Sequence, residues 1–248
     1  MSSRPSRAVL SHRERGIVLA LLLSLLLWQL PAGGLVLYPF KLLATWIHEM
    51  SHGLTMLATG AGFESLEIYE DTSGIAHASS GTSTFGRALI ASSGYMGASL
   101  LGAVLLVISQ SGRRARVALI VIGAAMLLSA WLWVDNRFGF IVSAVGGLLF
   151  VGSAIVLRER WASWALSFVA AQACINAVLD IRILFRAKLV INGEIAGASD
   201  AHRMAETTFG GPSLWAGLWL AWSFALFFVA LRIAHVRERR AKPKDPTD

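Results

Sequence analysis

Charged side chains are scarce in this sequence. Aspartate, glutamate, lysine and arginine make up 15% of its 248 residues, whereas a soluble domain usually has about a quarter. Hydrophobic residues make up 55%, and the mean hydropathy is +0.61. The composition therefore argues against an ordinary soluble domain and indicates a membrane protein.

Cysteine is almost absent as well. The single cysteine, Cys174, lies in an apolar stretch. One thiol cannot build a disulfide framework within the chain, so the cysteine content leaves the redox compartment open. The sequence also shows no internal repeat, nucleotide-binding loop or separate soluble domain.

The charges that are present are mostly positive, and the formal net charge is +7. In a soluble protein this excess would suggest a nucleic acid partner. Here the arginines gather in the tails and in short connections such as 111–116, where they orient helices and meet anionic lipid. We therefore expect the lipid bilayer, and no nucleic acid, as the partner of this charge.

Apolar segments fill most of the chain between residues 16 and 233, which we expect to form a single multi-span membrane domain. Most are about 17 to 25 residues long, as needed to cross ~30 Å of hydrocarbon. The basic tails, 1–15 and 234–248, are expected to be disordered. The predicted fold is an all-α polytopic membrane protein with six to seven transmembrane helices. The segments are 16–30, 35–59, 86–109, 117–134, 138–157, 161–185 and 213–233.

Two polar stretches interrupt these segments, a polar hairpin at 60–86 and a polar loop at 186–212. In the first, short apolar pieces flank the sequence Asp71-Thr72-Ser73-Gly74, which predicts a β-hairpin. Four spans separate the two stretches, so we expect both on the same side of the membrane. His77 in the hairpin is expected to be solvated rather than a metal ligand.

The number of spans and the distribution of charge disagree. Seven spans would place the two basic tails on opposite sides of the membrane, against the positive-inside rule. If one of the first two segments is re-entrant, six spans remain and both tails lie inside the cell. That arrangement moves the end with the two polar stretches to the outer face. The sequence leaves both arrangements open.

The second apolar segment contains the signature His48-Glu49-Met50-Ser51-His52. Histidines four residues apart stand on one helical face and can share one tetrahedral zinc, while Glu49 can reach the open position of the metal. Glu49 is then expected to act as general base on a water whose pKa the zinc lowers from about 16 towards 7. Such a short pattern also arises by chance. Ionisable residues are costly in a membrane helix, which favours a functional site holding one zinc.

A site of this kind needs a third protein ligand. Asp180 lies near the end of the sixth segment, with Asn176 on the same helical face. His52 and Asp180 both lie six or seven residues from the same interface, about 10 Å deep. We therefore expect Asp180 to be the ligand; the alternative is that it pairs with a helix-end arginine. The reserve candidates in the second polar stretch are Asp200, then Glu206 and His202.

With these features the chain resembles the site-2 protease family of intramembrane zinc metalloproteases, and more closely its small bacterial branch. The resemblance implies that His48 and His52 are zinc ligands and that Glu49 is the catalytic base. The family's third ligand is an aspartate on a later span, in a motif with a proline and a glycine that are missing around Asp180. The residues that carry the resemblance are His48–Gly53, Thr59-Gly60, Ser73-Gly74-Ile75, Ser93–Gly97 and Ser199–Ala201.

The resemblance also implies a substrate and a way of binding it. The family hairpin pairs with an unwound substrate by strand addition, which here implicates residues 63–77. We expect Ile68, Ile75 and Asn176 to be substrate-binding residues. The expected substrate is a membrane protein, and the expected location is the cell membrane of a bacterium, as a multi-pass protein. A metal-ion transporter and a non-catalytic metal-binding scaffold are the alternatives. The first usually shows internal repeats or broken helices, and the second has no use for Glu49.

Overall fold

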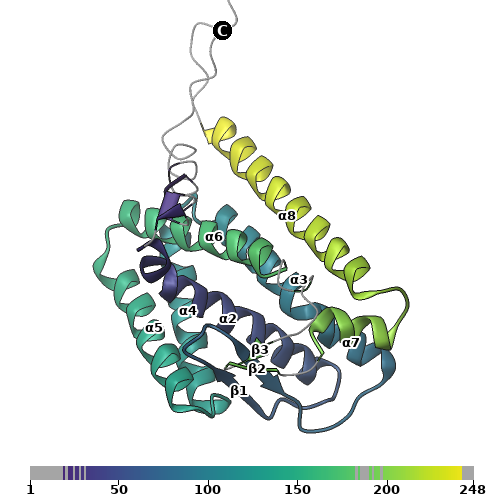
Figure 1. Ribbon diagram of the computed structural model, residues 1–248. Coiled ribbons are helices and arrows are strands. Elements are labelled where there is room, and N and C mark those ends of the chain that lie inside the picture. The colour runs from purple at the N-terminus through teal and green to yellow at the C-terminus, as the bar shows by residue number, and fades with distance from the viewer. Residues whose placement is uncertain are drawn as a thin grey trace, which may run out of the picture.

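The computed structural model describes residues 32–181 and 198–241, together with residues 19, 22–24, 26, 27, 29, 30, 184, 190, 191 and 193–195. These residues form long helices, one short helix and two small hairpins (Figure 1). The helices are α2 (Gly33–Ala58), α3 (Thr84–Ile108), α4 (Gly112–Leu132), α5 (Arg137–Val156), α6 (Glu159–Ile181), α7 (Asp200–Thr207) and α8 (Pro212–Ala241). The strands are β1 (Ser65–Ile68), β2 (Gly74–His77), β3 (Val190–Ile191) and β4 (Glu194–Ile195).

Five of the described helices are long and apolar enough to cross a membrane, namely α3, α4, α5, α6 and the part of α8 from Pro212 to Ala234. Their outward faces expose large apolar side chains such as Leu148 and Phe228, which lipid can solvate and water cannot. Helix α2 adds 26 residues that carry the histidine signature. The chain is therefore an all-α, multi-pass membrane protein, as the sequence predicts, with a span count near six to seven. Seven of the fifteen residues of the predicted first span, 16–30, lie outside the described residues.

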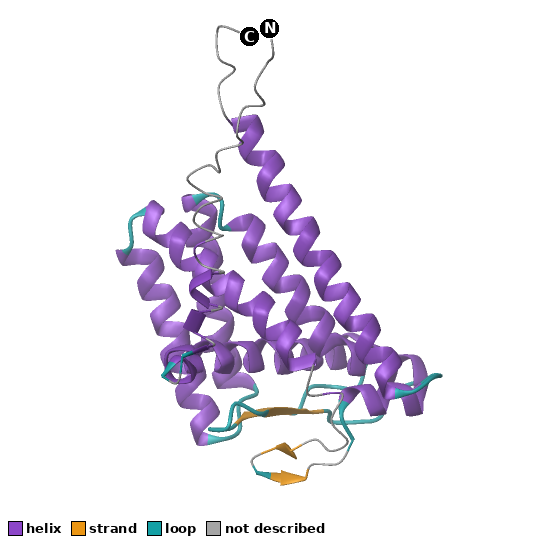
Figure 2. Ribbon diagram, turned by 45° about the horizontal axis from the view of Figure 1, so that its top comes forward, coloured by secondary structure: helices purple, strands orange, loops and turns teal. Residues whose placement is uncertain are grey.

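The two ends of the helical bundle differ in the segments that connect the helices there. At one end the α3–α4 and α5–α6 connections lie together, because the Arg116 guanidinium donates to the Leu157 carbonyl at 2.7 Å and the Ser163 hydroxyl donates to the Ser109 carbonyl. The hairpins and α7 lie at the opposite end (Figure 2). Both predicted polar stretches therefore lie at the same end of the helices.

The hairpin of β1 and β2 forms where the turn residues predict it, with Ile68 paired to Gly74 and Ser65 to His77. Its tip is anchored to α2, because Tyr38 donates to the Glu70 carbonyl at 2.6 Å and Thr45 to the Thr72 carbonyl at 2.5 Å. The hairpin is thus fixed along the helix that carries the histidines.

The outer edge of β1 is closed by the α4–α5 turn. The Leu66 amide donates to the Trp133 carbonyl at 2.7 Å, and the Asp135 amide donates to the Leu66 carbonyl at 3.1 Å. The Asn136 side chain accepts from the Ile68 amide at 3.2 Å and donates to the Ile68 carbonyl at 2.6 Å. With β1 closed in this way, the free edge of the hairpin is that of β2.

Two features differ from the sequence-based expectation. Helix α6 is described as far as Ile181, and residues 182, 183 and 185 of its predicted segment lie outside the described residues. The second polar stretch contains the short helix α7, because Ala201 and Met204, three residues apart, bury one apolar face. Helix α8 continues to Ala241, so the predicted disordered tail from 234 is helical over its first eight residues. Its residues there are mostly good helix formers, which extend the helix beyond the apolar span.

Candidate metal centre

Helix α2 places His48 and His52 one turn apart on the face that turns toward α3. Their Nε2 atoms lie 3.0 Å from each other, and the rings meet edge to face with centroids 4.7 Å apart. Two neutral imidazoles gain little from meeting in this way, whereas a cation between them would use both lone pairs.

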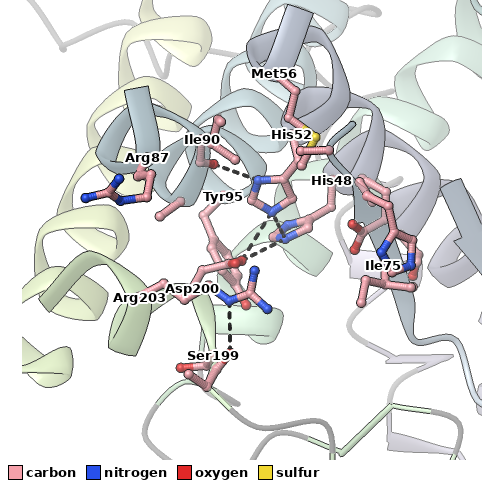
Figure 3. A pocket seen from close by; sticks show the side chains of 18 of the residues that line it. His48, His52, Met56, Ile75, Arg87, Ile90, Tyr95, Ser199, Asp200 and Arg203 are labelled. Carbon is pink, nitrogen blue, oxygen red and sulfur yellow. Dashed lines mark hydrogen bonds and ion pairs between the residues drawn. The ribbon is translucent and has the colours of Figure 1, made fainter. Parts of the chain in front are cut away.

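Asp200, the first residue of α7, completes the group (Figure 3). Its Oδ2 atom lies 3.2 Å from the Nε2 atoms of both His48 and His52. Ligand atoms bound about 2.0–2.1 Å from a tetrahedral zinc are separated by ~3.3 Å. The triangle formed by these three atoms therefore has the size of one face of a zinc site, and two imidazoles with one carboxylate are ligands that zinc accepts.

The imidazole of His52 is oriented by α3. Its Nδ1 atom lies 2.7 Å from the Ile90 carbonyl oxygen, to which it can only donate. That hydrogen bond fixes the tautomer and leaves the Nε2 lone pair free to bind a metal. The Ser93 hydroxyl lies 3.3 Å from the same Nδ1 atom and adds a second contact from α3.

Gly94 lets α3 approach this close. A methyl group in place of its hydrogen would lie 2.4 Å from the His48 Nε2 atom and 2.5 Å from the His52 Nε2 atom. Both distances are well inside van der Waals contact. The backbone of α3 therefore forms a wall against the two ligand atoms, and only glycine leaves room for them and a bound ion.

Burial and the neighbouring charges shift the pKa of Asp200 in opposite directions. Loss of water around the carboxyl raises its pKa, but the neighbouring His52 and His48 outweigh this effect and hold the pKa well below its usual range. Asp200 is thus ionised and can only accept, as a metal ligand must.

Glu49 is buried but stands apart from the three ligand atoms. Its side chain turns toward β2, where a methyl group on Gly74 would lie 2.9 Å from the Glu49 Cγ atom and where the Ala76 amide faces the carboxylate. The carboxylate therefore sits between the metal centre and the free edge of the hairpin.

The site opens into a cleft of about 1710 Å³, lined by the ligand group, Glu49, β2 and the start of α3. Pockets for small ligands usually measure about 300–1,000 Å³, so this cleft suits a longer, polymeric ligand. Residues from β2 and the turn before it, including Ile75, form one of its walls.

Strand β2 turns toward this cleft backbone groups that are not part of the hairpin ladder. Leu66 and Ile68 direct their amides and carbonyls away from β2, and directions alternate in an antiparallel ladder. Their partners Ala76 and Gly74 therefore direct theirs to the other side, the side of Glu49. Within the described residues this sheet has two strands only, so the edge of β2 is open to a third.

The structure places Asp180 and Asn176 in the wall of the same cleft. Asp180 is not part of the group of ligand atoms, which among the described residues consists of His48, His52 and Asp200, all within 4.8 Å of one another. Asn176 is buried, and its amide donates to the Phe40 carbonyl of α2 at 3.4 Å. The group thus contains Asp200, the first of the reserve candidates, and not Asp180.

Ile68 and Ile75, the two expected substrate contacts of the hairpin, lie in different surroundings. Ile68 is fully buried, and both of its backbone groups are bonded to Asn136. It belongs to the closed edge of the hairpin, whereas Ile75 lines the cleft. His77 also lines the cleft but lies outside the ligand group, with Nε2 at 3.9 Å from Glu67.

Sequence reasoning missed the parts of the site that α3 and α7 supply. The sequence indicates Gly94 and Tyr95 only through the resemblance carried by Ser93–Gly97, and it gives no signal for Arg203, which lines the cleft. A glycine followed by an aromatic residue at mid-helix was the available signal. This signal can be interpreted only when the helix that packs against α3 is known.

A family model described as Peptidase M50B-like matches residues 17–230 of the chain. No curated protein and no solved structure matches it. The matched range contains every residue that the structure places in the metal centre and in the wall of the cleft.

Proposed function

Since the chain belongs to the Peptidase M50B-like family, the site-2 protease family, we propose that it is an intramembrane zinc metalloprotease. It hydrolyses a peptide bond of a transmembrane or membrane-adjacent protein. The observation that carries this proposal is the triangle of His48, His52 and Asp200 with a buried carboxylate, Glu49, beside it. Transport or scaffolding alone gives no reason for that carboxylate to face an open strand edge.

The three ligand residues would hold one zinc, with Asp200 as the third ligand in preference to Asp180. The geometry supports this choice, because Asp200 Oδ2 is equidistant from the two histidine nitrogens. When bound, the zinc supplies an activated water at neutral pH and polarises the carbonyl of the substrate.

Glu49 holds the proton in this reaction. Its carboxylate accepts a proton from the attacking water and later returns a proton to the leaving amine. Burial beside β2 keeps bulk water away from the carboxylate and positions it at the strand edge, where the substrate backbone would lie.

The open edge of β2 would bind the substrate as an added strand. A helical substrate hides its amides in its own hydrogen bonds and must unwind before it can be cut. Unpaired amides in lipid cost several kcal/mol each. The outward backbone groups of Gly74 and Ala76 would replace the lost hydrogen bonds, and the side chain of Ile75 adds an apolar contact.

We further propose the cell membrane of a bacterium as the location, on the grounds of the small bacterial branch that the sequence resembles. The site lies at the end of the helices where the hairpins and α7 gather (Figure 2). Cleavage is therefore expected close to one membrane boundary.

The test is to purify the wild-type protein in detergent and to compare it with Glu49→Gln and His48→Ala. We expect about one zinc per chain and cleavage of a model transmembrane substrate for the wild type. Glu49→Gln should keep the zinc and lose cleavage, because it removes a base and no ligand, while His48→Ala should lose both. Full cleavage by Glu49→Gln would overturn the proposal.

A further inference from the structure

We propose that Tyr95 is a further catalytic residue of this site, which donates a hydrogen bond to the carbonyl oxygen of the scissile peptide bond as negative charge develops there. This inference rests on the proposed function and assigns a role that the metal ligands and Glu49 do not fill.

The ring of Tyr95 is held rigidly beside the metal centre. It meets the His48 ring edge to face, with centroids 4.5 Å apart and planes at 81°. It also stacks against Trp219 of α8, with centroids 5.4 Å apart and planes at 13°. Tyr95 directly follows Gly94, the residue that brings α3 against the histidines. Its position is thus set by the same contact that shapes the metal centre.

The hydroxyl of Tyr95 has no hydrogen-bond partner in the part of the chain that the structure describes. The other two tyrosines are satisfied, since Tyr38 donates to the Glu70 carbonyl at 2.6 Å and Tyr69 donates to the Glu67 carboxylate. A largely buried tyrosine normally finds such a partner. Because Tyr95 lines the cleft, its free donor is available to a ligand bound there.

The surroundings of this hydroxyl belong to the site. Tyr95 lines the same cleft as Asp200, Asp180 and Glu49, and its ring meets that of His48. A phenol carries its proton at neutral pH and can donate it in a hydrogen bond.

Tyr95 and Glu49 approach the metal centre from different sides. Glu49 turns toward β2 and its Gly74, whereas Tyr95 lies on the side of α3 and α8. Figure 3 shows Ile75 on one side of His48, with Tyr95, Asp200 and Arg203 on the other. A peptide carbonyl lying between these sides would present its carbon to a water held by Glu49 and its oxygen to the hydroxyl of Tyr95.

In the addition step the water oxygen bonds to the carbonyl carbon, Glu49 takes a water proton, and the π electron pair of the carbonyl moves onto its oxygen. In the collapse step that pair re-forms the carbonyl, the C–N bond breaks, and the amine leaves with a proton from Glu49. Tyr95 keeps its proton throughout. Its hydrogen bond strengthens only while the oxygen is charged, so it lowers the barrier without tightening substrate binding.

The first test compares Tyr95→Phe with the matched control Ser143→Ala, which removes another buried hydroxyl without a hydrogen-bond partner from α5, outside the cleft lining. With a model transmembrane substrate, Tyr95→Phe should lower kcat about 10²–10³-fold, the usual effect of losing one such donor. KM and zinc content should stay as in the wild type. Ser143→Ala should leave kcat unchanged. Replacement of Tyr95 by 3-fluorotyrosine, which keeps the donor, should restore kcat.

The second test measures binding and does not depend on turnover. A phosphinic peptide mimics the tetrahedral anion, and the same peptide with an ordinary amide mimics the ground state. Tyr95→Phe should weaken binding of the phosphinic peptide by the factor that kcat/KM loses. When Glu49→Gln is also present to prevent cleavage, Tyr95→Phe should leave the affinity for the amide peptide unchanged.

Equal binding of the phosphinic peptide by wild type and Tyr95→Phe would overturn the role of Tyr95, as would a loss of zinc that accounts for the loss of kcat. Failure of the wild type to cleave any substrate in a Glu49-dependent way would instead overturn the proposed function. In that case the phosphinic peptide still decides whether Tyr95 donates to a bound anion.

Discussion

The third ligand is a question of single residues. Asp180 and Asp200 are both carboxylates in the wall of one cleft, and they differ in where they stand relative to the histidines. Asp200 has an oxygen 3.2 Å from each ring nitrogen, whereas Asp180 remains outside the group of close ligand atoms. Because coordination requires direct contact with the metal, this difference supports the proposal that Asp200 is the third ligand.

We therefore predict that Asp200→Asn lowers the zinc content of the purified protein far more than Asp180→Asn does. An amide binds zinc weakly, and its loss of charge leaves two imidazoles to hold the ion. Zinc content measured by mass spectrometry on both variants, each with a thermal unfolding curve as a folding control, makes the comparison. The opposite order would return the ligand role to Asp180.

A second residue-scale prediction concerns Gly94. The change Gly94→Ala places a methyl group about 2.4–2.5 Å from both ligand nitrogens, so either the histidines or α3 must move. We expect most of the zinc to be lost, even though no ligand is altered. The matched control is Gly152→Ala in α5, where the added methyl group meets nothing within 4 Å and zinc should be retained. Full zinc occupancy in Gly94→Ala would show that α3 is not a wall of the site.

At the scale of elements, the hairpin has one closed edge and one open edge. Asn136 and the Trp133 carbonyl form hydrogen bonds along the outer edge of β1, while the edge of β2 faces the cleft. This asymmetry changes the sequence-based expectation for proline substitutions. A proline at Ile68 would break an anchor of the hairpin rather than a substrate contact, and a proline at Ile75 would break the ladder with Glu67.

The informative position is Ala76, whose amide faces away from β1 and toward the Glu49 carboxylate. Ala76→Pro removes that donor both from Glu49 and from an added strand, and edge strands tolerate proline where the amide is not part of the ladder. We expect cleavage to fall at least tenfold, roughly the effect of losing a hydrogen bond of 1.5 kcal/mol, with zinc retained. Ala76→Ser keeps the amide and should cleave as the wild type does. Equal rates for the two variants, measured on one transmembrane substrate, would argue against strand addition at this edge.

At the scale of the whole molecule, function depends on where the metal centre lies relative to the membrane. The hairpins and α7 share one end of the helices (Figure 2), and the proposed ligands lie on α2 and α7. A substrate helix reaches the centre only if it frays near that boundary, because unwinding deeper in lipid exposes amides without partners.

We predict cleavage within the first turns of a substrate span, on the side of the hairpin. Glycine or proline near that point should speed cleavage, because each weakens the helix that must unwind, and a leucine-rich replacement should slow it. Mass spectrometry of the products locates the cut. A matched substrate with the same glycine placed at the opposite end of its span should be cut no faster. Cuts confined to soluble loops far from the membrane would contradict this prediction.

The sequence by itself determined everything that depends on near neighbours in the chain. The spacing of His48 and His52 needs only one helix, and the Asp71–Gly74 turn needs only its own residues, so both were predictable. Apolar length likewise determined the membrane architecture. These features are local, and local geometry follows from the periods of helix and strand.

Only the tertiary structure decided which distant residues complete the site. Asp200 lies 152 positions after His48. It is on a short helix that the sequence did not predict, because the surrounding stretch is polar. Asp180 matched the histidines in depth, but depth is one coordinate, and coordination needs the rotation and lateral position of each helix as well. Those are set by packing, here by the contact of Gly94 with two imidazoles and by the turn that closes β1 over Ile68. The spacing of residues along the sequence does not predict such contacts. They join segments that are far apart in the chain, and the order of those segments does not determine which of their side chains meet.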